Sequence, residues 1–223
     1  MPERFVLAIA PSEPIGALVY AAPAGADISL ILAHGAGAGQ TSPFMVSFAA
    51  ALASRGIETI TFNFRYIEAG RRVPDRNDRL EAAWRRMIAA HRDGELGTQT
   101  RRLAIGGKSM GGRIASQVAA ADGEGIAGLV FLGYPLHPPG RPDKPRSAHL
   151  PQIRAPMLFV QGSRDAFGTP AELAPVVKTL AAPAKLCVVE DGDHSFKVRR
   201  PRSQSAVFDF ILDAVEHWLR ALP

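Results

Sequence analysis

Apolar runs of strand length alternate along the chain with longer segments in which apolar residues recur at helical spacing. The runs that predict buried strands are residues 28–34, 57–64, 101–107, 126–135, 156–162 and 184–190. Helical patterns lie between or after them, at residues 44–56, 78–92, 110–122, 170–181 and 205–222. Strand followed by helix, repeated along one chain, predicts a mostly parallel sheet with helices on both faces.

The N-terminal part has a different pattern. Apolar runs at residues 4–10 and 17–22 are separated by a turn that contains proline and glycine, which predicts an antiparallel hairpin. The fold class we expect is therefore α/β, with about seven or eight strands in the central sheet. Because no internal repeat or linker composition divides the sequence, we expect a single domain over residues 1–223.

Local signals predict where several elements begin and end. Gly56 is expected to end the first long helix, residues 65–77 to form a polar loop, and Asp78 to cap the helix that follows. Pro175 is expected to lie in the first turn of its helix or to break that helix, because proline lacks the backbone N–H.

Composition places the chain among ordered globular proteins. Hydrophobic residues make up 47% and charged residues 21%, which is too apolar a balance for a disordered chain. The formal net charge of +5 is dispersed over several segments; this favours solubility and leaves an anionic substrate open. No nucleic-acid motif occurs, and aromatic residues do not interleave with the arginines, so we expect no nucleic-acid partner.

The single cysteine, Cys187, lies in the apolar run KLCVVE and is expected to occupy a buried strand position. One cysteine cannot form an internal disulfide. The N-terminal apolar stretch is too short for a secretory signal, and no segment reaches the length of a membrane span. We therefore expect a cytoplasmic protein that does not associate with membranes.

The octapeptide GGKSMGGR places Ser109 between a predicted strand and a predicted helix, with glycine two residues before and two residues after it. This pattern is typical of the nucleophile elbow, a turn so tight that bulky neighbours would clash. Gly107, Gly111 and Gly112 supply the room, and the N-terminus of the following helix favours developing negative charge. A phosphate-binding P-loop is the alternative, but Arg102 stands where that pattern requires its first glycine.

A serine nucleophile needs a general base and an acid that orients the base. In this architecture the acid follows a later strand and the histidine follows the last one. Asp165, in FVQGSRDAFG, and His194, in CVVEDGDHSF, occupy these places. Asp191 and Asp193 are rivals of Asp165, but they are too close in sequence to reach behind the His194 ring easily. We expect Ser109, His194 and Asp165 to form a catalytic triad.

Acyl transfer also needs two backbone N–H donors for the tetrahedral oxyanion. Met110 follows the nucleophile and is expected to provide one of them. Ala36 is expected to provide the other from the loop HGAGAG, whose small residues let the backbone approach a substrate. A plain glycine-rich turn is the alternative for this loop, and His34 is expected to be structural rather than catalytic.

Taken together, the motifs LAHGAGAG, FNFRY, GGKSMGGR, GYPLHPPGRP, FVQGSRDAFG and GDHSF resemble the α/β-hydrolase superfamily, in its dienelactone-hydrolase-like branch. They look like a set of small bacterial members that is also similar to the hydrolase-like domain of a eukaryotic chromatin-complex subunit. The resemblance implies Ser109 as nucleophile, His194 as base and Asp165 as its orienting acid, with Ala36 and Met110 as oxyanion donors. True dienelactone hydrolases use a cysteine nucleophile, so their substrate is not carried over to this sequence.

Several residues beside the predicted site are candidate substrate contacts. Arg65 and Tyr66 directly follow one predicted strand and Tyr134 lies at the end of another, so these three are candidates to line a pocket, with ordinary solvation or packing as the alternative. Phe167 is expected either to form pocket wall or to pack internally. The loops here are too short for a large helical lid, which predicts little or no lid.

The expected function is a serine hydrolase that cleaves esters or thioesters of small to medium acyl groups through an acyl-enzyme. Its partner would be a small-molecule acyl substrate; amide hydrolysis, acyl transfer and perhydrolysis stay open, as does the oligomeric state. No cluster of residues has metal-ligand spacing, so we expect no metal and no organic cofactor. The alternative from another class is a non-catalytic interaction module that has kept the fold.

Overall fold

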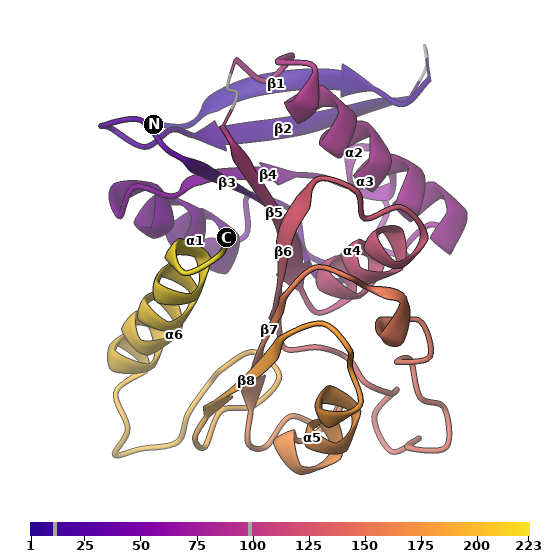
Figure 1. Cartoon of the computed structure of the whole chain (residues 1–223), viewed down its shortest axis with the longest axis vertical. Coiled ribbons are helices and arrows are strands. Elements are labelled where there is room, and N and C mark those ends of the chain that lie inside the picture. The colour runs from indigo at the N-terminus through magenta and orange to yellow at the C-terminus, as the bar shows by residue number, and fades with distance from the viewer. Residues whose placement is uncertain (11–12, 98–99) are drawn as a thin grey trace.

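The strands that the apolar runs predict assemble into one sheet (Figure 1). A computed structural model describes residues 1–10, 13–97 and 100–223, and within them the sheet has eight strands in the order β1-β2-β4-β3-β5-β6-β7-β8. β1 pairs antiparallel with β2 and β2 with β4, whereas every later pair is parallel. The strands are β1 Glu3–Ala8, β2 Pro14–Tyr20, β3 Ile28–Ala33, β4 Glu58–Phe62, β5 Arg102–Lys108, β6 Ile126–Leu132, β7 Met157–Gly162 and β8 Ala184–Val189. The predicted parallel sheet with its N-terminal antiparallel hairpin is confirmed.

Helices cover both faces of this sheet, and Figure 1 shows α1 and α6 on one side and α3 and α4 on the other. The helices are α1 Pro43–Ser54, α2 Arg65–Glu68, α3 Asn77–Arg92, α4 Met110–Ala121, α5 Pro170–Lys178 and α6 Gln204–Arg220, with a 3₁₀ turn η1 at Leu150–Gln152. No helix in the described part of the chain is both long enough and apolar enough to cross a membrane.

The central strand β3 shows why its sequence is apolar throughout. Leu30 and Leu32 belong to the core on the α1 and α6 side, whereas Ile31 and Ala33 belong to the core on the α3 and α4 side. All four side chains are fully buried. A strand covered on both faces needs an apolar residue at every position rather than at every second one.

The parallel strands bring their carboxyl ends to one edge of the sheet. The segments that leave this edge are residues 34–42 after β3, residues 63–64 after β4, Ser109 after β5, residues 133–149 after β6, residues 163–169 after β7 and residues 190–203 after β8. Four of these six segments contain a residue that the sequence predicts to take part in catalysis.

Two boundary predictions around α3 need correction, while the one for α1 agrees with the structure. Residues 65–77, expected to form a polar loop, contain the short helix α2. Asp78 does not cap α3, because this helix begins at Asn77 with Arg76 as its N-cap; Asp78 lies in the first turn, where its charge favours the helix dipole. Gly56 follows the end of α1 with φ at 83°, as expected for a residue just past a helix.

The prediction for Pro175 is wrong. Pro175 lies inside α5, beyond its first turn, and the helix continues past it to Lys178. A capping box stabilises the start of this helix: Glu172 accepts a hydrogen bond from the Thr169 N–H at 2.8 Å, and Thr169 accepts one from the Glu172 N–H at 3.4 Å. The missing N–H of Pro175 therefore removes one intrahelical bond without ending the helix.

Predictions at the two edges of the sheet also differ from the structure. Cys187 is half-buried rather than buried, because β8 is an edge strand that has only β7 beside it in the described chain. At the other edge, β2 begins at Pro14, which we expected in the turn. The rest of that turn includes residues 11 and 12, which lie outside the described residues.

Candidate active site

Ser109 occupies a strained position between β5 and α4. Its φ is 50° and its ψ is −115°, and a positive φ is costly for a residue that carries a Cβ. The neighbouring glycines make this turn sterically feasible. A Cβ at Gly107 would lie 2.5 Å from the Ala33 carbonyl oxygen, and a Cβ at Gly111 would collide with the same oxygen. The glycines flanking Ser109 are therefore required by the close approach of α4 and β5 to β3.

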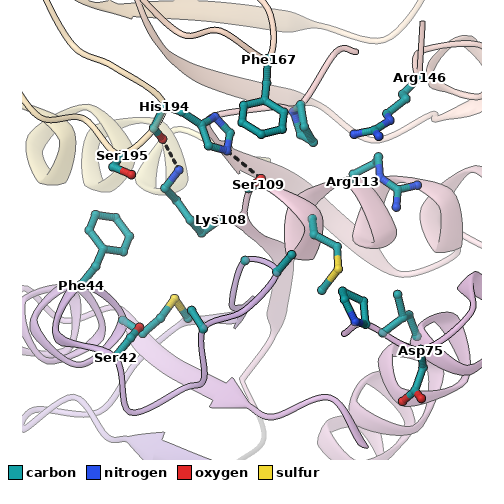
Figure 2. Close-up of a pocket in the computed structure, with 18 of the residues that line it drawn as sticks. Ser42, Phe44, Asp75, Lys108, Ser109, Arg113, Arg146, Phe167, His194 and Ser195 are labelled. Carbon is teal, nitrogen blue, oxygen red and sulfur yellow. Dashed lines mark hydrogen bonds between the residues drawn. The ribbon is translucent and has the colours of Figure 1, made fainter. Parts of the chain in front are cut away.

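His194 and Asp165 reach Ser109 from two other loops. The Ser109 Oγ lies 2.8 Å from His194 Nε2 (Figure 2). His194 Nδ1 lies 2.8 Å and 3.0 Å from the two carboxylate oxygens of Asp165. A carboxylate only accepts, so Nδ1 carries the imidazole proton and Nε2 accepts from the serine hydroxyl. The structure thus brings the three predicted residues into one hydrogen-bonded chain.

Asp165 is held in place by groups other than the histidine. Its side chain is almost completely buried, and it accepts hydrogen bonds from the Phe167 N–H at 2.8 Å and from the Gln161 side-chain amide at 2.9 Å. A buried carboxylate needs several donors to stay charged. Gln161, on β7, is a supporting residue that the sequence analysis missed.

The two rival aspartates have other partners. Asp191 pairs with Arg199 and Arg164, and the hydrogen bonds from Arg199 lower the pKa of Asp191 to about 2. Asp193 accepts hydrogen bonds from the backbone N–H groups of Ser195 and Lys197 at 2.8 and 2.9 Å. Neither carboxylate is hydrogen-bonded to the imidazole, so both serve to shape the histidine loop.

The loop after β3 lies directly against the serine. A Cβ built at Gly35 would lie 3.6 Å from the Cβ of Ser109, and both Ala36 and Met110 line the same cavity as Ser109. Met110 is the first residue of α4, so its N–H has no acceptor within the helix. The structure therefore brings both predicted oxyanion donors to the cavity that contains the serine hydroxyl.

Both ring nitrogens of His34 contact backbone groups and hold the loop after β3 in place. The His34 Nδ1 lies 2.8 Å from the Gly35 carbonyl oxygen, and its Nε2 accepts a hydrogen bond from the Phe64 N–H at 3.3 Å. Burial lowers the pKa of His34 to about 4, which keeps the ring neutral and matches its role as acceptor. His34 thus ties the β3 loop to the segment after β4, as expected of a structural residue.

Lys108 adds a contact that the sequence did not reveal. Its Nζ donates a hydrogen bond to the His194 carbonyl oxygen (Figure 2). It also lies 4.9 Å from the centre of the Phe196 ring. Burial lowers the pKa of Lys108 to about 8, although the nearby carboxylates of Asp165 and Asp193 oppose this shift. The residue before the nucleophile therefore links the elbow to the histidine loop. The sequence signal that could have revealed this contact is a charged residue at the end of an otherwise apolar strand.

The serine opens into a cavity of about 640 Å³. Phe44 and Met45 of α1 line one part of it, and Arg113 and Arg146 line another (Figure 2). Phe167 forms part of the wall and packs on the His194 ring, with ring centres 4.2 Å apart. Phe167 thus combines the two roles that its sequence position left open.

Three residues predicted to contact substrate do not line this cavity. Tyr66 is completely buried and packs against His34, with ring centres 6.0 Å apart. Tyr134 is buried and donates its hydroxyl hydrogen to a backbone carbonyl at 2.8 Å. Arg65 begins α2 and is absent from the lining residues. Position after a strand indicated the correct edge of the sheet, but side-chain direction was set by packing in the core.

Comparison with known proteins agrees with this geometry. A family model described as an alpha/beta hydrolase domain matches residues 26–220. A dienelactone hydrolase from Anabaena variabilis is 21% identical over 98% of this chain and 99% of its own, with a TM-score of 0.74. A serine hydrolase without a lid from Xanthomonas campestris is 22% identical over 100% and 97%, with a TM-score of 0.75. The esterase domain of a Rhodothermus marinus protein is 15% identical over 100% and 99%, with a TM-score of 0.73.

At these identities the structural likeness concerns the fold alone. Together with the family match it confirms the predicted α/β-hydrolase fold and the resemblance to dienelactone-hydrolase-like proteins.

Proposed function

This chain belongs to the α/β-hydrolase family, and on that premise we propose that it is a serine hydrolase that cleaves carboxylic esters or thioesters of small to medium acyl groups. One observation carries the proposal. An unbroken series of hydrogen bonds runs from the Ser109 hydroxyl through His194 to Asp165, and the hydroxyl lines a cavity. A cavity of about 640 Å³ suits a small-molecule substrate.

In the proposed mechanism, Ser109 Oγ attacks the substrate carbonyl carbon while His194 Nε2 takes the hydroxyl proton. The imidazolium that forms is stabilised by the adjacent Asp165 carboxylate, which also holds Nδ1 protonated. Nε2 then returns the proton to the leaving oxygen or sulfur, and the acyl-enzyme remains. Water attacks the acyl carbon with His194 as base, and the acid and free serine are released.

The negative charge on the tetrahedral oxygen needs donors that are already in position. In our proposal these are the backbone N–H groups of Met110 and Ala36. The N-terminus of α4 adds a favourable field, because its aligned peptide dipoles point their positive end at the serine. Arg113 donates its N–H to the Ser109 carbonyl at 3.1 Å, so the serine is continuous with the first turn of the helix.

The test is a panel of p-nitrophenyl esters and acyl-CoA thioesters of increasing chain length, together with a fluorophosphonate probe. We expect wild-type protein to hydrolyse short members of the panel and to be labelled at Ser109. The variant Ser109→Ala should lose about 10⁴-fold or more in kcat/KM and all labelling, because the nucleophile is gone.

Ser54→Ala is the matched control, since the Ser54 hydroxyl is exposed and bonds only to the Ala51 carbonyl among the described residues. Equal turnover by wild type and Ser109→Ala would refute the assignment. A folded wild-type protein that the probe never labels would instead favour the interaction module.

A further inference from the structure

Two arginines line the cavity on the side away from Phe44. Figure 2 shows the guanidinium groups of Arg113 and Arg146 on one side of Ser109 and Phe44 on the other. Neither arginine takes part in any ion pair with the described residues. Burial, and then the neighbouring charge of Arg146, lowers the pKa of Arg113. Two partly buried cations side by side are costly unless an anion joins them.

Arg113 is held by the helix that follows the nucleophile. It lies one turn after Ser109 on α4, and its backbone N–H donates to the Ser109 carbonyl at 3.1 Å. Its guanidinium donates to the Gln117 side chain at 3.3 Å and to the Asn77 side chain at 3.5 Å. These acceptors are neutral amides, so they orient the guanidinium without cancelling its charge.

Arg146 is held through its backbone. Its N–H donates to the Leu136 carbonyl at 2.7 Å, and its own carbonyl accepts from the Tyr134 hydroxyl at 2.8 Å. Three residues later, His149 Nε2 lies 2.7 Å from the hydroxyl of Ser116, which belongs to α4. The segment that carries Arg146 is thus attached to the helix that carries Arg113, so the backbones of the two arginines are held next to each other.

Two acidic residues of this region, Asp75 and Glu81, pair with other arginines. Asp75 lines the same cavity, but its carboxylate accepts from Arg71 at 2.6 Å, and Figure 2 shows it turned away from the two arginines. Glu81 on α3 pairs with Arg85 at 2.9 Å. This side of the cavity therefore keeps an excess of positive charge.

We propose that Arg113 and Arg146 bind a carboxylate carried by the substrate, so that the enzyme acts on esters or thioesters with a second, anionic end. Guanidinium groups match the planar, two-oxygen geometry of a carboxylate, and charge-assisted bonds of this kind are among the stronger ones in proteins. The inference rests on the proposed function, and it specifies that the ester or thioester attacked by Ser109 also carries a carboxylate.

The experiment compares acids with their methyl esters, which have the same chain but no charge. One pair is mono-p-nitrophenyl glutarate and its methyl ester, where the carboxylate is on the acyl side. The other is p-acetoxybenzoate and its methyl ester, where it is on the leaving group. We expect wild type to prefer the acid by about 10-fold or more in kcat/KM in one pair, which identifies the side that faces the arginines.

In Arg146→Gln and in Arg113→Gln this preference should fall to about 1, and the ratio within each protein cancels any general loss of activity. Arg141→Gln is the matched control. Arg141 lies on the same connection but is exposed, pairs with Asp143 at 3.0 Å and does not line the cavity. The control should keep the full preference, and added salt should weaken the preference in wild type.

A second measurement separates this inference from the proposed function. Glutarate should raise the melting temperature of Ser109→Ala protein and should not raise that of Ser109→Ala, Arg146→Gln protein. If no ester is hydrolysed but this difference is found, the proposed function fails and the carboxylate site stands. Equal turnover of acid and methyl ester in both pairs, a preference that survives both arginine variants, or the absence of both hydrolysis and glutarate stabilisation would overturn the inference.

Discussion

At the scale of single residues, the site contains two residues in energetically unfavourable states, one of backbone conformation and one of buried charge. Ser109 keeps a positive φ because α4 and β3 leave no other path for the turn. Lys108 is drawn into a partly buried position by the His194 carbonyl and the Phe196 ring. A positive φ and a buried charge each cost stability, and both residues line the cavity of the proposed active site, where such local costs are expected to gather.

The cost of burying the Lys108 charge can be tested by the pH dependence of the free energy of unfolding. The folded-state pKa of about 8 is below that of the unfolded chain, so between about pH 8 and 10.5 the unfolded chain binds more protons than the folded one. The free energy of unfolding of wild type, relative to Lys108→Met, should therefore rise with pH over this window, by at most about 1.4 kcal/mol per pH unit. Urea unfolding of both proteins at several pH values measures the difference.

The same variant should lower kcat about 10-fold at pH 7.5, because the His194 loop loses its tie to the elbow, while far-ultraviolet circular dichroism stays unchanged. A stability difference that stays flat from pH 8 to 10.5 would contradict the assigned burial of the charge.

At the scale of elements, capping and close approach determine where helices can lie. α4 contacts β3 through glycine, and the indole N–H of Trp84 on α3 donates to the Gly111 carbonyl at 3.2 Å, which ties the two helices together. α5 is the opposite case: it lies over the end of the sheet, contains Pro175, and has one residue, Leu173, that is fully buried. Such a helix depends on its cap more than on its packing.

The cap of α5 is therefore expected to matter. Thr169→Ala removes the side-chain acceptor of the capping box and should reduce the free energy of unfolding by about 1 kcal/mol. Thr169→Ser retains the hydroxyl and should remain within a few tenths of a kcal/mol of wild type. Denaturant unfolding distinguishes the two variants, and an equal loss in both would show that the methyl group, not the cap, stabilises this end of α5.

At the scale of the whole molecule, one sheet joins two separate cores. Adjacent residues of β3 enter opposite cores, so neither core can form without the strands that it shares with the other. We therefore propose that residues 1–223 fold as a single domain with one cooperative transition.

The two tryptophans allow the unfolding of the core on each face of the sheet to be measured separately. Trp84 is buried in the core on the α3 side, and Trp218 of α6 packs against the core on the other side. Single-tryptophan variants, Trp84→Phe and Trp218→Phe, should each show a fluorescence transition that coincides with the loss of circular dichroism. Transitions that separate along the denaturant axis in either variant would show that the two faces unfold independently.

The sequence by itself determined the parallel sheet with its N-terminal hairpin, and the loops that carry the three residues of the proposed triad. These features depend on local physics: hydrophobic periodicity, glycine where a turn has no room, and polar residues just past a strand. Ser109, Asp165 and His194 could be identified because they follow β5, β7 and β8, parallel strands whose carboxyl ends lie at one edge of the sheet.

Only the tertiary structure decided which side chains face the cavity. Tyr66 and Tyr134 follow strands as expected but turn into the core, whereas Arg113 and Arg146 reach the cavity from a helix and from an irregular segment. The direction of a side chain is set by packing among residues that are far apart in the sequence, and no local pattern records it. The proposed chemistry at the serine can thus be predicted from the sequence, whereas the proposed choice of substrate depends on contacts that exist only in the folded molecule.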